Sequence, residues 1–289
     1  MRFVFLICVV LVAFASNSIL NRMAVGGGEI DAILFALVRA FAGAVTLAVL
    51  VLIQRRGLPV LAPARIVGAG SLTVYLIGFS IAYIQMDAGL GALILFGGVQ
   101  VTMFAGALIG GERPPARRWI GAALALAGLA WLSWPSGAAA LPAVAVIAML
   151  AAAVGWGIYS LAGRRATDPM AETGANFIWS VPPLLLLTLV RPVQSDGVAT
   201  TATGIVLAVV AGGLTSGLGY ALWYAVLPKL RGSTSALLQL TVPVIAMAAG
   251  VALLGEVITW RMVGAGAVTL GGIAYGLGLF QRRTGSSTS

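Results

Sequence analysis

The sequence contains no histidine, one cysteine and one lysine among 289 residues. Histidine is the side chain that most often transfers protons or binds metal ions near neutral pH, so the usual centre of such chemistry is missing. The lone Cys8 excludes a disulfide within the chain. Charged residues make up only 9% of the chain, whereas a soluble domain is about one quarter charged. This chain therefore cannot cover a surface that faces water.

Apolar residues are the main component of the sequence. They make up 60% of the chain, and the mean hydropathy is +1.05. The apolar runs are continuous rather than alternating, which is typical of membrane helices and not of a membrane barrel. The 38 glycines suit close helix packing in a bilayer. The sequence thus predicts an all-α membrane protein with the lipid bilayer as its main partner.

A span needs roughly 20 apolar residues, and reading the chain for such runs predicts ten. They cover residues 3–21, 31–53, 66–86, 89–109, 118–134, 142–162, 173–190, 203–227, 233–254 and 260–280. The first run includes Ala13-Phe14-Ala15, a pattern typical of a signal-peptide cleavage site. We expect it to stay as a helix, because its loss would leave nine spans and disturb the distribution of charge.

Basic residues are concentrated in alternate loops of this ten-span topology, as they are in cytoplasmic loops. With a cytoplasmic N-terminus, the inside segments hold Arg2, Arg55, Arg56, Arg65, Arg113, Arg117, Arg118, Arg164, Arg165, Lys229, Arg231, Arg282 and Arg283. The outside segments hold Arg22, Arg191 and Arg261. The prediction is that both termini are cytoplasmic. The same asymmetry accounts for the net charge of +9, so no nucleic-acid partner is expected.

The two halves of the chain resemble each other. At a fixed offset of 144 residues, Glu112 matches Glu256, Gly128 matches Gly272 and Trp131 matches Tyr275. The chain is therefore predicted to consist of two five-span units, 1–137 and 138–289. Because five is odd, the second unit enters from the opposite side of the membrane. Inverted repeats of this kind are typical of secondary transporters, with a substrate site near the midplane.

These features resemble the drug/metabolite transporter superfamily, and within it the EamA-type ten-helix exporters. The stretch "ALWYAVLPKLRGSTSALLQLTVPVIAMAAGVALLGE" carries the clearer likeness, and "AYIQMDAGLGALILFGGVQVTMFAGALIGGE" repeats it more loosely. The resemblance implies export of small metabolites, often amino acids, through a central cavity lined by spans 1, 3, 4, 6, 8 and 9. The first span lacks the essential acid of the small four-helix relatives, so their proton coupling cannot be carried over.

Aromatic residues on three spans are candidates for the wall of such a cavity. Tyr75, Phe79 and Tyr83 form one helical stripe. Trp156 and Tyr159 lie one turn apart, as do Tyr220 and Tyr224. Aromatic faces bind planar or cationic groups, but they also anchor helices at membrane interfaces. We select as candidate substrate-binding residues Phe79, Tyr83, Trp156, Tyr159 and Tyr224.

Amides inside spans are further candidates, since buried polar groups must find a partner. Asn17, Gln100 and Gln239 lie in the first, fourth and ninth spans. The alternative is a hydrogen bond between helices.

Four residues are assigned to structural or gating roles. Arg39, within "ALVRAFAG", is expected to reach the external headgroups, fix a neighbouring helix or attract a carboxylate. Glu112 and Glu256 follow glycine-rich helix ends beside arginines, which favours a structural ion pair or cap over proton coupling. Pro243 bends the ninth span and is a potential hinge.

The predicted function is export of small amphiphilic metabolites by alternating access, with amino acids, and among them aromatic or large neutral ones, as the favoured substrates. The chain is assigned to a bacterial inner membrane. Two alternatives remain: a broad exporter of cationic drugs, and a channel or lipid scramblase. No cofactor and no metal are expected, and an intramembrane enzyme is not favoured because no acid lies at the midplane of a span.

Overall fold

The computed structural model describes residues 2–54, 57–63, 65–86, 88–133, 142–190, 200–254 and 260–279. Outside these residues lie several positions of the predictions above, namely Glu256, Arg55, Arg56, Arg191, Arg282 and Arg283. Every regular element within the described part of the chain is helical.

The helices, in chain order, are α1 (Arg2–Asn21), α2 (Ala32–Ile53), α3 (Arg65–Ala82), α4 (Ala88–Ile109), α5 (Ala116–Ser133), α6 (Ala143–Gly163), α7 (Pro169–Val190), α8 (Ala202–Val210), α9 (Gly219–Val226), α10 (Gly232–Gln239), α11 (Val242–Leu254) and α12 (Trp260–Leu277). Shorter segments adjoin them: the π-helical η1 (Arg22–Gly26) and η2 (Ala211–Leu218), and the 3-10 segment η3 (Leu227–Lys229).

By length and composition, six helical stretches of the described residues could each cross a membrane. They are Arg2–Gly26, Ala32–Ile53, Arg65–Ala82, Ala143–Gly163, Pro169–Val190 and Ala202–Lys229. Shorter apolar helices, Ile94–Ile109, Gly232–Ala246 and Val263–Leu277, overlap the fourth, ninth and tenth predicted spans.

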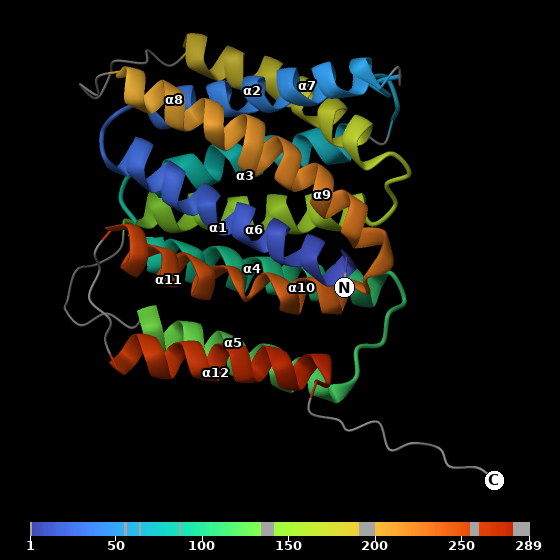
Figure 1. Cartoon of the computed structure of the whole chain (residues 1–289), viewed down its shortest axis with the longest axis vertical. Coiled ribbons are helices and arrows are strands. Elements are labelled where there is room, and N and C mark those ends of the chain that lie inside the picture. Colours follow the sequence, from blue (N-terminus) through green and yellow to red (C-terminus); the bar gives the residue numbers. More distant parts are fainter. Residues whose placement is uncertain are drawn as a thin grey trace.

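The helices lie side by side in one bundle (Figure 1). At one end of its long axis α5 packs on α12, and at the other α2 packs on α7. Between these pairs lie α1, α3, α4, α6 and α9, with α3 against α6 and α1 against α9. The start of α1 and the end of α12 lie at the same end of the helices (Figure 1). The middle of the bundle is therefore enclosed by five helices drawn from both halves of the chain.

Glycines allow the closest of these contacts, since lipid supplies no hydrophobic force between helices and packing must be tight. A Cβ atom on Gly121 of α5 would lie 2.6 Å from the carbonyl oxygen of Gly272 in α12. A Cβ atom on Gly78 of α3 would lie 2.3 Å from the carbonyl oxygen of Ala148 in α6. Backbones thus touch directly where two glycine-bearing helices meet.

The predicted ninth span, 233–254, is divided in the structure. Helix α10 ends at Gln239 and α11 begins at Val242, with Pro243 in the first turn of α11. Proline lacks the N–H that a continuous helix needs, and the first turn of a helix is the place where that donor is not required. The expected bend at Pro243 is therefore a break between two shorter helices.

Candidate functional site

A small cavity lies among the five central helices. Its volume is about 10 Å³, room for about one water molecule. Its wall includes Phe14, Asn17, Tyr75, Phe79, Trp156 and Tyr220. We call it the central cavity. It brings together three of the predicted site residues, Asn17, Phe79 and Trp156, from α1, α3 and α6.

Aromatic rings fill most of the space around the central cavity. The Trp156 ring lies 5.0 Å from Phe14, 5.0 Å from Tyr75 and 4.6 Å from Tyr220, measured between centroids. Tyr75 and Phe79 are 5.1 Å apart. These separations are those of favourable ring pairs, each worth about 0.5–1.5 kcal/mol beyond its buried area. The cavity is thus a cage of rings around a very small space.

Gln239 positions the tryptophan of this cage. The Trp156 indole N–H donates to Gln239 Oε1 at 2.5 Å. The Gln239 amide nitrogen in turn donates to Met103 Sδ at 3.0 Å and to the Ser235 carbonyl at 3.4 Å. Gln239 is not among the residues that line the central cavity. In the structure it contacts Trp156, so it acts behind the wall.

The polar part of the wall is built on the π-helical segment η2. Asn17 Oδ1 accepts hydrogen bonds from the hydroxyls of Thr215 at 2.6 Å and Ser216 at 3.0 Å. The Asn17 amide nitrogen donates to the Thr215 carbonyl at 3.2 Å. A π-helical turn shifts side chains from their α-helical register and often occurs at functional sites. Here it brings two hydroxyls of the second half onto the amide of α1.

Arg39 of α2 is completely buried behind this wall. Its Nε donates to Ser216 Oγ at 2.7 Å, and Nη2 donates to the hydroxyls of Tyr220 at 2.6 Å and Tyr75 at 3.4 Å. The guanidinium also lies 5.6 Å from the Phe79 ring centroid. Of the roles considered for Arg39, reaching the headgroups is wrong, because the side chain points into the bundle. Its partners are side-chain hydroxyls rather than backbone carbonyls.

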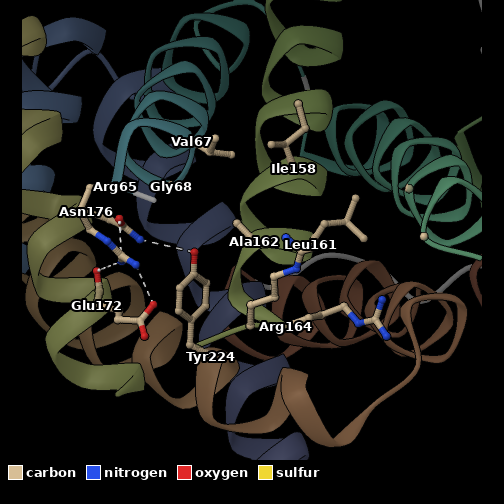
Figure 2. A pocket seen from close by; sticks show the side chains of 13 residues that line it. Arg65, Val67, Gly68, Ile158, Leu161, Ala162, Arg164, Glu172, Asn176 and Tyr224 are labelled. Atoms are coloured by element: carbon tan, nitrogen blue, oxygen red, sulfur yellow. Dashed lines mark hydrogen bonds and ion pairs between the residues drawn. The ribbon is translucent and has the colours of Figure 1, made fainter. Parts of the chain in front are cut away.

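A second cavity, of about 620 Å³, lies near one end of the helices. Arg65 at the start of α3, and Arg164 and Arg165 after α6, line it, and we call this end the basic face. The larger space is called the vestibule. Glu172 and Tyr224 also line it (Figure 2).

Ion pairing and hydrogen bonds join the two halves at the vestibule. Arg65 Nη2 lies 2.8 Å from Glu172 Oε2, and Arg65 Nη1 donates to Asn176 Oδ1 at 3.3 Å. The Asn176 amide nitrogen donates to the Tyr224 hydroxyl at 3.4 Å (Figure 2). Arg65 belongs to α3 and its partners Glu172 and Asn176 to α7, so these contacts connect the halves at the basic face.

Tyr159 and Tyr224 connect the vestibule to the central cavity. The two rings are 4.7 Å apart, and Tyr159 stacks on Trp156 at 5.5 Å. The Tyr224 hydroxyl donates to the Tyr159 carbonyl at 3.1 Å. Tyr224 lines the vestibule and Trp156 lines the central cavity, so Tyr159 is the link between the two spaces.

Two other predicted site residues line neither cavity. Tyr83 follows α3, with its ring 4.8 Å from Phe79. Gln100 of α4 is buried. Within the described residues, the Tyr83 hydroxyl and both side-chain polar atoms of Gln100 have no hydrogen-bond partner. They remain buried polar groups for which this conformation provides no hydrogen bond among the described residues.

Glu112, between α4 and α5, caps helix α10 of the other half. Its carboxylate accepts from the Gly232 N–H at 2.9 Å, from Ser233 Oγ and from Arg118 at 2.8 Å. Burial alone raises the pKa of the Glu112 carboxyl, but the hydrogen bonds from Ser233 and Gly232 and the charge of Arg118 outweigh it and hold the pKa below its usual value. Glu112 thus has an ion-pairing and capping geometry at this face; Glu256 is outside the described residues.

Sequence reasoning passed over several members of the site. Tyr75 and Tyr220 were visible in the aromatic stripes but not chosen, and Phe14 carries no distinguishing signal in an apolar helix. Glu172 and Asn176, near the start of α7, also gave no pattern. Their roles depend on which helices pack together.

The apolar helices, enclosing a buried cavity with a wider space at one end, define the class as an integral membrane protein. Comparison with known proteins gives the family. The EamA-like transporter family matches residues 143–276, and the chain belongs to that family within the drug/metabolite transporter superfamily.

Two curated relatives and one solved structure illustrate the likeness. An uncharacterized protein of Pseudomonas aeruginosa is 43% identical over 277 residues, which cover 94% of this chain and 93% of that protein. A protein of Salmonella typhimurium, named a probable amino-acid metabolite efflux pump, is 27% identical over 196 residues, covering 64% and 65%. A crystal structure with 21% identity matches 98% of this chain and 99% of its own with a TM-score of 0.77, which shows the fold alone.

Proposed function

We propose that this protein exports small amphiphilic metabolites from the cytoplasm, with aromatic or large neutral amino acids as the preferred class. The observation that carries the proposal is the central cavity, a cage of rings with one polar wall. Ligand sites are mostly apolar with a few placed polar groups, and this wall has that composition. The name of the Salmonella typhimurium relative supports the amino-acid class.

Alternating access between two inverted five-helix units, 1–137 and 138–289, is the proposed mechanism. The packing supports it: α2 pairs with α7, and α5 with α12, which are the corresponding helices of the two units. The third helix of the first unit, α3, packs on the first helix of the second unit, α6. In the same way α9, part of the third predicted span of the second unit, packs on α1, the first helix of the first unit. This exchange of partners is what a pseudo-twofold axis in the membrane plane produces.

The conformation described here corresponds to a state open toward the basic face, which we assign to the cytoplasm of a bacterial inner membrane. The vestibule has about 620 Å³ whereas the central cavity has about 10 Å³. Ligand sites measure about 300–1,000 Å³, so the cage must expand to take a substrate. Tyr159 and Tyr224 are the proposed gate, because they connect the two spaces.

Flux in proteoliposomes that contain the purified full chain tests the function. Labelled aromatic and large neutral amino acids are expected to show saturable, stereoselective flux, which a channel or lipid scramblase does not show. Trp156→Ala removes a ring that is 3% exposed, and its matched control, Trp260→Ala, removes one that is 90% exposed. Only the first substitution should impair flux; absence of flux for every amino acid would overturn the substrate class.

Orientation is tested separately by labelling single cysteines in a Cys8→Ser background. Arg165→Cys places a thiol at the basic face, and Gln85→Cys places one after α3, at the other end of that helix. A membrane-impermeant maleimide applied to intact cells is expected to label only the second. The reverse pattern would contradict the assigned orientation.

A further inference from the structure

The polar wall of the central cavity offers hydrogen-bond donors beside the buried charge of Arg39, which has no counter-ion among the described residues. We infer that this wall binds the carboxylate of the substrate, so that aromatic carboxylates and zwitterions are substrates and aromatic cations are not. The inference rests on the proposed function, because it takes the central cavity as the transport site.

The first step is the charge of Arg39. Its side chain is completely buried, and every hydrogen bond it makes goes to a neutral hydroxyl, on Ser216, Tyr220 or Tyr75. Among the described residues it forms no ion pair, and its Nη1 atom has no hydrogen-bond partner. A buried charge is costly unless it is paired, and in membrane proteins such a group commonly marks a substrate or ion site. An anionic ligand would supply the missing partner.

The second step is the count of phenol protons. Arg39 Nη2 donates to both phenol oxygens, and one phenol then donates to the other across 3.2 Å. Each phenol has a single proton, so whichever of Tyr75 and Tyr220 donates, the proton of the other is left over. Since both phenols line the central cavity, one polarised O–H remains available to an acceptor placed there.

The third step is the amide of Asn17, which also lines the cavity. Its oxygen accepts two hydrogen bonds, from Thr215 and Ser216. Its nitrogen has two N–H groups, and only one bond from it, to the Thr215 carbonyl, is made within the described chain. The second N–H group of the Asn17 amide is therefore also a hydrogen-bond donor that can serve a ligand.

Together these groups place donors of the cavity wall beside the positive charge of Arg39, and the Ser18 hydroxyl, which also lines the cavity, can donate as well. A carboxylate, which only accepts hydrogen bonds, matches such a wall, whereas an ammonium, which only donates, meets a like charge. The rings of Trp156 and Phe14 lie beside these donors and suit the apolar part of the ligand. The wall thereby selects an aromatic acid over an aromatic amine.

The test uses three ligands with one aromatic ring and different charge: 3-phenylpropionate, phenylalanine and 2-phenylethylamine. Flux and binding, the latter by quenching of tryptophan fluorescence, are measured with the purified full chain. We expect the acid and the zwitterion to compete with each other and the amine not to compete. Arg39→Gln should weaken carboxylate binding about tenfold or more, since a charge-assisted interaction is lost, and should abolish the preference over the amine.

The double variant Tyr75→Phe/Tyr220→Phe covers the case in which Arg39→Gln does not fold. Either phenol alone still has one unused proton, so both are replaced; this removes the phenol donors while keeping the rings and the charge, and a severalfold loss of carboxylate affinity is expected. Arg231→Gln, at a side chain that is 64% exposed, is the matched control for loss of one positive charge. Equal flux of amine and acid, or unchanged selectivity in both site variants, would overturn the inference and leave amphiphile export standing. No flux of any of the three ligands would overturn the proposed function and the inference with it.

Discussion

Arg118 and Arg231, two arginines that the structure places beside Glu112, differ in burial, and this difference gives a sharp prediction. Arg118 lies 2.8 Å from the carboxylate, and the two side chains are 10% and 8% exposed. Arg231 lies 3.9 Å from the same carboxylate, but its side chain is 64% exposed. We expect Arg118→Gln to destabilise the protein strongly and Arg231→Gln to leave its stability nearly unchanged.

The magnitude follows from burial. Removing one partner of a buried pair leaves an uncompensated charge, which costs about 3–5 kcal/mol in a protein interior. Glu112 keeps its bonds from Gly232 and Ser233, so we expect about 2–3 kcal/mol here. An exposed pair contributes less than about 1 kcal/mol. At roughly 2 °C per kcal/mol, Arg118→Gln should lower Tm by about 4–6 °C.

Thermal unfolding in detergent, followed by tryptophan fluorescence, provides the measurement. The pKa of Glu112 is lower in the folded protein than its ordinary value. Its contribution is therefore complete above the ordinary glutamate pKa of about 4.3 and is lost as the pH falls below it. The Tm difference between the wild type and Arg118→Gln should accordingly shrink in acid. Equal effects of the two arginine substitutions, or a difference that persists unchanged in acid, would refute the reasoning.

Two further predictions concern packing and positioning. Gly78→Ala should lower Tm, because its Cβ would lie 2.3 Å from the Ala148 carbonyl oxygen and overpacking costs about 1–3 kcal/mol. Gly70→Ala is the control on the same helix: its Cβ would meet open space, so the substitution should be neutral or slightly stabilising. A similar loss for both would contradict this. Gln239→Leu should reduce amino-acid flux severalfold without loss of folded protein, because the Trp156 N–H loses its 2.5 Å acceptor; unchanged flux would mean that Gln239 does not position the ring.

Much of the fold could be predicted from the sequence, because apolar length and charge are local properties. The predicted sixth span, 142–162, corresponds to α6 at Ala143–Gly163, and the eighth, 203–227, lies within the continuous stretch Ala202–Lys229. The break at Leu240 and Thr241 was predicted only as a bend. Proline signals a disturbance, but the neighbouring helices decide whether the chain bends or separates into two helices.

The positions of the site residues could be predicted from the sequence only in part. Asn17, Phe79 and Trp156 were chosen for their chemistry, and they do line one cavity. Gln239 was chosen as a wall residue and instead holds Trp156, while Gln100 contacts neither cavity. A side chain one turn further along a helix faces a different neighbour, and nothing in an apolar sequence states which neighbour that is.

The sequence by itself determined the membrane class, the family likeness and the aromatic character of the site, since these follow from composition, periodicity and short motifs. Only the tertiary structure decided the role of Arg39. In the sequence Arg39 is an arginine early in an apolar span, which is compatible with three roles: reaching the headgroups, fixing a neighbouring helix or attracting a carboxylate. Its place against Ser216, Tyr220 and Tyr75 depends on contacts between residues up to 181 positions apart, which a turn of π-helix and close helix packing bring together.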